Sequence, residues 1–142
     1  MKADGSVVAW GAGGCGESDY MDYEQACVPA TVGEIVAVAG GVVHSIGLRS
    51  DGSVAAWGAG ECGQSGWLQY GQSCVPALNS DFIAVATGQT HTVGLKSDGS
   101  IVAWGRNSQG QCDVPIPNGG FVAVSAGTAH NLALRADGSV LA

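Results

Sequence analysis

The sequence has no long hydrophobic run and few basic side chains. No apolar run approaches the roughly 18 residues that a membrane-spanning helix needs, which argues against such a helix. Only 5 Lys and Arg residues stand against 12 acidic ones, giving a formal net charge of −7. Because binding to nucleic acid and to anionic membrane surfaces depends on basic side chains, we expect neither kind of partner. A basic or neutral protein partner is easier to accommodate.

Helical periodicity and catalytic motifs are also missing. No stretch repeats its apolar residues at helical spacing. The glycine-rich residues 10–14 are not followed by the Lys-Ser/Thr pair of a phosphate loop, and the aspartates lack the dense spacing of a calcium loop. No Cys-x-x-Cys pair indicates zinc. We therefore expect no metal or cofactor, and we do not expect an enzyme.

One short segment, referred to below as the phrase, occurs four times in the sequence, the last time in part. The phrase DGSVVAWG at residues 4–11 returns at 51–58 and 98–105, and as DGSVLA at 137–142. Successive copies begin 47, 47 and 39 residues apart. Because a fixed period of this size indicates a repeat array, we expect one repeat domain over residues 1–142. Its repeats are 4–50, 51–97, 98–136 and a partial repeat 137–142.

Each period is predicted to form β-strands. In the third period, two apolar segments at 121–127 and 130–136 precede an Asp-Gly pair and a further apolar segment. Asp-Gly between such segments predicts a hairpin, because glycine accepts the positive φ of a tight primed turn. The same hairpin is written at 45–57 and 92–104. Three strands are thus visible in each unit, and we expect a fourth near the Cys-Val-Pro segment.

The repeated residues resemble a known family. The pattern Val-Ala-Val-x-x-Gly-x-x-His, followed by Leu-[Arg/Lys]-x-Asp-Gly-Ser and Ala-Trp-Gly, resembles the RCC1-type repeat (regulator of chromosome condensation). Residues 104–115 are most similar to its bacterial version. The resemblance implies an all-β fold of RCC1-like β-propeller blades, with about three four-stranded blades in this chain. It implies binding roles rather than one particular activity.

Three blades do not close a ring, since the family implies about seven. An open arc leaves exposed strand edges, which pair readily with other chains. One interpretation is that the sequence is a fragment of a longer propeller. The other, which we favour, is self-association, in which two chains form a homodimer that completes the ring. In that joint, residues 4–11 of one chain and 137–142 of the next would compete for one position.

Two loop insertions begin and end with cysteine. The shorter third repeat has only Cys112, which we align with the closing cysteine of each insertion and expect to be a free core thiol. The spacing predicts loop-closing disulfides, with buried reduced thiols as the alternative. Disulfides would indicate an extracellular or periplasmic location. The expected pairs are Cys15–Cys27 and Cys62–Cys74.

The same insertions carry aromatic residues at matched positions, and the first is acidic. Aromatic side chains on loops above a rigid scaffold are typical of a binding site. The alternative is that they pack on one another or on the neighbouring blade. The candidate partner-binding residues are Tyr20, Tyr23, Trp67, Tyr70, Asp19, Asp22 and Glu24.

The three histidines recur with the repeat. His44, His91 and His130 occupy equivalent positions, which favours hydrogen bonding inside the propeller over catalysis. We therefore predict a non-enzymatic binding module that presents its inter-strand loops to a protein partner. The alternatives are a structural fragment of a larger propeller with no independent activity, and a glycan-binding module.

Overall fold

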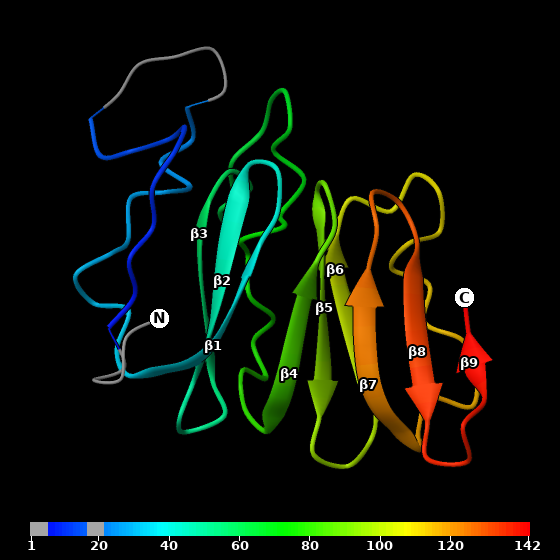
Figure 1. Cartoon of the computed structure of the whole chain (residues 1–142). Helices are drawn as coiled ribbons and strands as arrows, with labels where there is room; N and C mark the ends of the chain where they lie inside the picture. Colours follow the sequence, from blue (N-terminus) through cyan, green and yellow to red (C-terminus); the bar gives the residue numbers. More distant parts are fainter. Residues whose placement is uncertain (1–5, 17–21) are drawn as a thin grey trace.

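The computed structural model describes residues 6–16 and 22–142, and its strands form three antiparallel sheets. Figure 1 shows the sheets side by side, in the manner of propeller blades. This confirms the predicted all-β architecture. Within the described ranges, no helix has the length and apolarity of a membrane span. The strands are β1 (Ile35–Gly40), β2 (His44–Arg49) and β3 (Val54–Gly58); β4 (Phe82–Thr87), β5 (His91–Lys96) and β6 (Ile101–Gly105); and β7 (Phe121–Ala126), β8 (Asn131–Arg135) and β9 (Val140–Leu141).

The hydrophobic core lies between blades rather than within one. Alternate residues of a strand face opposite sides of a sheet, so each blade offers one apolar face to the next. Between the first and second blades, Ile46 and Leu48 of β2 belong to one buried cluster with Phe82 and Trp104. The cluster between the second and third blades repeats this arrangement, with Val93, Leu95, Ile101 and Phe121. Burial of apolar surface therefore holds neighbouring blades together.

The Asp-Gly hairpins differ from the predicted tight primed turn. Arg49 donates its N–H to the carbonyl of Ser53 at 2.8 Å, and Gly52 donates back to Arg49 at 3.0 Å. Gly52 has a φ of 79°, whereas Asp51 is not among the described residues with positive φ. A primed turn needs positive φ at both central residues, so the loop is instead the three-residue type with a glycine bulge. Asp51 accepts the Ser53 N–H at 2.8 Å and rigidifies the turn.

Each blade has three strands, and the fourth strand expected near Cys-Val-Pro does not form in the described residues. The proline removes one N–H that a strand ladder would need. Side chains supply the hydrogen bonds in its place. Asn79 accepts the N–H of Val54 at 2.7 Å and donates to the carbonyl of Val54 at 2.9 Å. Asn118 makes the same pair of bonds to Ile101, both at 2.8 Å.

The blades straddle the sequence repeats. β1 and β2 come from repeat 4–50, but β3, which completes their sheet, comes from repeat 51–97. The second and third blades are divided in the same way. Every sheet therefore joins two neighbouring repeats through the β2–β3 type of hairpin.

Candidate functional site

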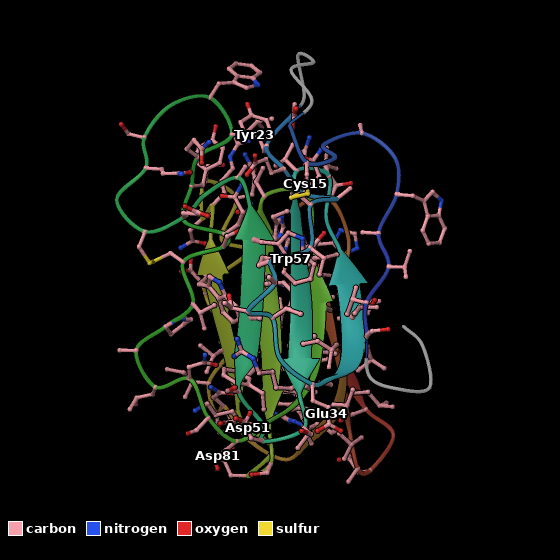
Figure 2. All side chains as sticks on the ribbon, turned by 90° about the vertical axis from the view of Figure 1, so that its left-hand side faces the viewer. Cys15, Tyr23, Glu34, Asp51, Trp57 and Asp81 are labelled. Carbon is pink, nitrogen blue, oxygen red and sulfur yellow. A yellow bond between two sulfur atoms is a disulfide. The ribbon has the colours of Figure 1, made fainter. Side chains whose placement is uncertain are left out.

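Two disulfides close the long loops. Cys15–Cys27 and Cys62–Cys74 are bonded, with Cα–Cα distances of 4.7 and 4.6 Å, which confirms the predicted pairs. Figure 2 shows Cys15 at one end of the blades, whereas Asp51 lies at the opposite end. The chain therefore has a loop end, carrying the cysteines, and a hairpin end.

Cys112 does not occupy the position of the closing cysteines, so our alignment of it was wrong. Its Sγ contacts the carbonyl of Arg106 at 3.3 Å, in the way that Oγ of Ser73 donates to the carbonyl of Ala59 at 2.8 Å. Cys112 thus replaces Ser73, which precedes Cys74 by one residue. A Val-Pro pair follows Cys27, Cys74 and Asp113 alike, which places Asp113 opposite the closing cysteines.

The third loop is closed by hydrogen bonds instead of a disulfide. Asp113 takes the position of Cys74, and its Oδ1 accepts a bond of 2.8 Å from Nδ2 of Asn107. Cys112 is free and half-buried rather than part of the core. Burial, together with the nearby Asp113 carboxylate, raises the pKa of the Cys112 thiol. Because the thiolate is the reactive form, this cysteine is a poor nucleophile.

A glutamine side chain shapes each loop from inside. Oε1 of Gln72 accepts the N–H of Tyr70 at 2.9 Å, while its Nε2 donates to the carbonyl of Leu68 at 2.6 Å. Gln25 accepts from Tyr23 at 2.9 Å, and Gln111 accepts from the equivalent residue of its loop at 2.8 Å. These bonds satisfy buried polar groups and fix the backbone on which the aromatic residues stand.

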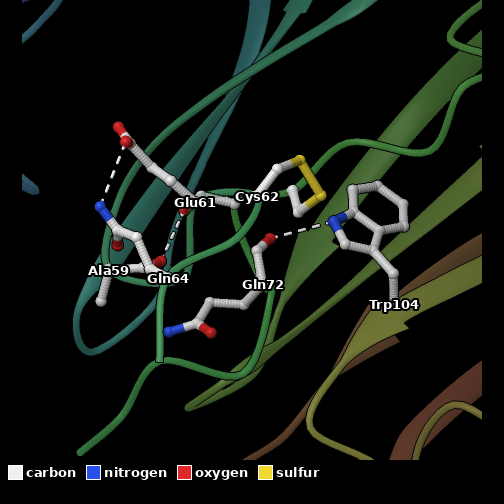
Figure 3. Close-up of a disulfide and its surroundings, with 8 residues drawn as sticks. Ala59, Glu61, Cys62, Gln64, Gln72 and Trp104 are labelled. Carbon is white, nitrogen blue, oxygen red and sulfur yellow. Dashed lines mark hydrogen bonds between the residues drawn. A yellow bond between two sulfur atoms is a disulfide. The ribbon is translucent and has the colours of Figure 1, made fainter. Parts of the chain in front are cut away.

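The main-chain carbonyls of the same glutamines attach the loops to the blades. The carbonyl of Gln72 accepts the indole N–H of Trp104 at 3.0 Å (Figure 3) and the hydroxyl of Thr92 at 3.0 Å. The carbonyl of Gln25 accepts from Trp57 at 2.9 Å and Ser45 at 2.8 Å. Trp57 and Trp104 therefore have a structural role, in which they attach the loops to the blades.

Two of the candidate aromatic residues, Tyr23 and Tyr70, contact other parts of the protein, whereas Trp67 is exposed to solvent. The hydroxyl of Tyr23 donates to the carbonyl of Trp67 at 3.2 Å, so the two disulfide loops touch. Tyr23 also packs on a buried cluster that contains Leu68. Tyr70 is 40% exposed, and the guanidinium of Arg106 lies 5.0 Å from its ring centroid. Trp67 is 72% exposed.

Two of the acidic candidates, Asp22 and Glu24, lie around a tight turn. Oδ1 of Asp22 accepts the N–H of Glu24 at 3.0 Å, and Glu24 is exposed with a φ of 57°. Tyr20 and Asp19 lie outside the described residues. Sequence reasoning missed the glutamines, although Gln25, Gln72 and Gln111 keep the 47- and 39-residue spacing. It also missed Arg106, whose contact with Tyr70 arises from the packing of separate loops.

His44 and His91 take part in hydrogen bonds between blades. Nε2 of His44 lies 3.0 Å from the hydroxyl of Thr92, and Nε2 of His91 lies 2.8 Å from Oδ1 of Asn131. Burial, with a smaller contribution from His91, lowers the pKa of His44 from 6.5 to about 4. His130 is exposed, because no further blade packs beside the third one in the structure. These contacts support the structural interpretation of the histidines.

Comparison with protein families identifies the repeat. The model of the regulator of chromosome condensation (RCC1) repeat matches residues 35–64 and 82–111. The chain carries RCC1 repeats. The matched stretches begin at β1 and β4 and run through β3 and β6 into the following loops. No curated protein sequence matches this RCC1-repeat chain significantly.

Solved propellers share the fold. The CRINKLY WD40 ectodomain of the Arabidopsis thaliana receptor kinase ACR4 is 21% identical, with a TM-score of 0.71 over 98% of this chain and 44% of its own. Prp20p from Saccharomyces cerevisiae is 25% identical, with a TM-score of 0.60 over 79% of this chain and 31% of its own. Human WBSCR16 is 21% identical, with a TM-score of 0.62, covering 80% and 33% respectively. The RCC1-repeat chain thus spans between about a third and under half of each propeller.

Proposed function

We propose that the chain is a non-enzymatic binding module that presents its disulfide loops to a protein partner. The observation that carries this proposal is the 72% exposure of Trp67 on a loop closed by Cys62–Cys74. Covering an exposed tryptophan side chain costs little free energy, because its surface is mostly apolar. A loop already ordered by a disulfide and by Gln72 also loses little conformational freedom on binding. Such a residue fits the usual description of a binding hot spot.

A relative of the same fold and the net charge of the chain support a protein partner. Prp20p, which shares the fold, has been studied for its binding properties to Gsp1p and histones. The net charge of −7 favours a basic or neutral surface over nucleic acid or an anionic membrane. We assign the central contact to Trp67. The remaining contact residues are proposed to be Tyr20, Tyr23, Tyr70, Asp19, Asp22 and Glu24.

A glycan ligand is the less favoured occupant of this surface. Sugars stack on open aromatic ring faces, but Arg106 lies over the ring of Tyr70 and Tyr23 is half-buried. Trp67 is the widely exposed aromatic residue of the described part of the disulfide loops. One such ring gives a small platform for a sugar, whereas it is sufficient to anchor a protein contact.

Photo-crosslinking can test the loop surface. A benzoylphenylalanine placed at position 67 should form one discrete protein adduct in extract of the source organism, and the same probe at the exposed position of Leu78, outside the disulfide loops, should not. The affinity of the isolated partner should fall by about tenfold or more with Trp67→Ala. Leu78→Ala, which removes a 79% exposed apolar side chain outside the loops, should leave it unchanged. Binding to a glycan array without a protein adduct would contradict the proposal.

Self-association is a second proposal, and it concerns a different surface. Leu132 and Leu134 of β8 and Val140 of β9 are exposed, whereas their equivalents in the first two blades are buried. A sheet face of this kind in the other blades is covered by the next blade. We propose that a second copy covers it here, as the sequence predicted.

A further inference from the structure

A pocket opens between the second and third blades. Its volume is about 250 Å³, and its walls come from β5, β6, the third blade and the loop that connects the two blades. Gln111 lies on the loop side of the pocket, and Leu141 and Ala142 lie on the side of β9. Most of its lining residues are apolar, with the polar exceptions concentrated on the loop. The pocket is therefore suited to an apolar group that carries a polar edge.

The pocket walls repeat the surroundings of Trp104. Trp104 is held in the cluster between the first and second blades together with Ile46, Val54, Val75, Phe82, Val85 and Val102. The residues at the same repeat positions, one blade further along, all line the pocket. They are Val93, Ile101, Val114, Phe121, Val124 and Leu141. The side chains that surround an indole in one interface thus surround an open pocket in the next.

The loop offers the matching hydrogen-bond acceptor. The carbonyls of Gln25 and Gln72 each accept one indole N–H, from Trp57 and Trp104. Gln111 is the equivalent residue, and its carbonyl accepts Nδ2 of Asn131 at 2.6 Å. A carbonyl oxygen has two lone pairs, as the carbonyl of Gln72 demonstrates by binding both a tryptophan and a side chain of β5. The carbonyl of Gln111 can therefore bind an indole N–H as well.

The chain also has an equivalent tryptophan, Trp10, that lies outside all of the sheets. Trp10 belongs to the phrase DGSVVAWG and is equivalent to Trp57 and Trp104. It is 85% exposed, compared with 5% and 8% for those two residues. Residues 6–11 carry the sequence of an outer strand, but they join none of the sheets. In Figure 1 this N-terminal segment runs beside the first blade, on the side away from the second blade.

We propose that the pocket is a binding site for Trp10 of a second copy of this chain, delivered as part of an outer strand. The indole would enter between the second and third blades, and its N–H would bind the carbonyl of Gln111. The wall residues and the acceptor identify the occupant, because around Trp104 their equivalents enclose the tryptophan of an Ala-Trp-Gly strand. The inference rests on the proposed self-association and is independent of partner binding by the loops.

Strand pairing favours an incoming strand from a second copy over β9. β9 pairs with β8 at two positions, Ala133↔Leu141 and Leu134↔Val140. β3, the equivalent strand of the first blade, pairs with β2 at five positions. An incoming strand of residues 7–11 matches β3 in length and sequence. In place of β9 it would bring Val8 to the position of Leu141 in the pocket wall, and it would replace two paired positions with five. Its continuation into the donor's first blade would bring that blade against the exposed Leu132.

Light scattering on a sizing column tests the proposal with the 142-residue chain. At tens of micromolar we expect a mass at least twice that of the 14.1 kDa chain. Trp10→Ala should shift assembly to concentrations at least about tenfold higher. Trp67→Ala is the matched control, because it also removes an exposed tryptophan, and it should assemble like the unchanged chain. A monomeric parent chain, or equal assembly of the Trp10→Ala variant, would overturn the proposal.

Filling the pocket from within the same chain provides the reciprocal test. A chain extended by Trp-Gly after Ala142 should be monomeric, because its own tryptophan would occupy the pocket. An Ala-Gly extension should still assemble. A synthetic peptide of residues 4–13 should bind the Trp10→Ala chain, and the peptide with Trp10 replaced by Ala should bind at least about tenfold more weakly. Persistent assembly of the Trp-Gly chain would refute the pocket site, while crosslinking at position 67 reports separately on the loops.

Discussion

Nε2 of His44 lies 3.0 Å from the hydroxyl oxygen of Thr92, across the boundary between the first two blades. Thr92 donates its only hydroxyl proton to the carbonyl of Gln72. His44 must therefore donate through Nε2, which leaves Nδ1 as the unprotonated nitrogen. Nδ1 is buried without a hydrogen-bond partner in the described structure. A proton added there would be a buried charge with no acceptor, which explains the low pKa of His44.

Stability should fall as the pH is lowered from 7 to 4. The pKa of His44 is about 4 in the folded chain against an ordinary 6.5, so the unfolded chain binds more protons between these values. The His44 contribution is complete above pH 6.5 and lost by pH 4, an effect of roughly 3 kcal/mol. Urea unfolding at several pH values measures it. His44→Gln should reduce the pH dependence, whereas His130→Gln, at an exposed position, should leave it unchanged.

Adjacent glycines at the end of β1 should respond differently to alanine. A Cβ at Gly41 would lie 2.5 Å from Cε1 of His44 and 2.8 Å from the carbonyl oxygen of Gly88, whereas a Cβ at Gly40 would meet nothing within 4 Å. Neither glycine has a positive φ, so only the contacts differ. We expect Gly41→Ala to lower the free energy of unfolding by about 1–3 kcal/mol or more. Gly40→Ala should change it by less than about 1 kcal/mol, and equal effects in chemical denaturation would contradict this explanation.

Reduction of the disulfides should destabilise the loop end. Each bridge closes a loop with a sequence separation of 12, for which chain entropy predicts about 3 kcal/mol. Melting with and without reductant should show the loss, and Cys62→Ser with Cys74→Ser should reproduce half of it. Cys112→Ser is the control, because serine already occupies the equivalent position in the second loop. A large effect of that control would show that Cys112 has a role beyond its hydrogen bond to Arg106.

Asn79 should stabilise β3 by replacing a fourth strand. Its amide makes two hydrogen bonds to the backbone of Val54. Asn79→Ala should lower the free energy of unfolding by about 2 kcal/mol, since each bond contributes about 1 kcal/mol. Asn79→Asp keeps the acceptor but loses the donor, so we expect an intermediate loss near neutral pH. Hydrogen exchange at the Val54 amide distinguishes the two variants, and unchanged protection in Asn79→Ala would exclude this role.

Repetition explains why the fold was predictable. The spacing of the Asp-Gly-Ser phrases defined the hairpins, and the cysteines at both ends of each insertion predicted the disulfides. The number of strands in a blade was less accessible. The bonds that Asn79 makes to Val54 join residues 25 positions apart, and no local pattern announces them. The alignment of Cys112, in contrast, can be obtained from the sequence, because a Val-Pro pair follows Cys27, Cys74 and Asp113 alike.

The candidate binding residues were predictable only as a group. Their matched positions on long loops indicated a shared surface. The sequence could not separate Trp67, which faces solvent, from Tyr23, which is tied to the neighbouring loop, because that division depends on how two insertions pack together. Arg106 was invisible for the same reason, since it approaches Tyr70 from another repeat. Periodicity thus predicts equivalent positions, and contacts between repeats decide how each one is used.

The boundaries of the sheets do not coincide with those of the sequence repeats, and this affects how the gene can change in length. Because neighbouring repeats share a sheet, no single repeat is a self-contained structural unit. A deletion of residues 51–97 would nevertheless join Ser50 directly to Asp98, within the same Asp-Gly hairpin, and every remaining sheet would keep its strands. Unequal recombination at these near-identical phrases could therefore lengthen or shorten the gene by whole blades, without ever passing through a broken sheet.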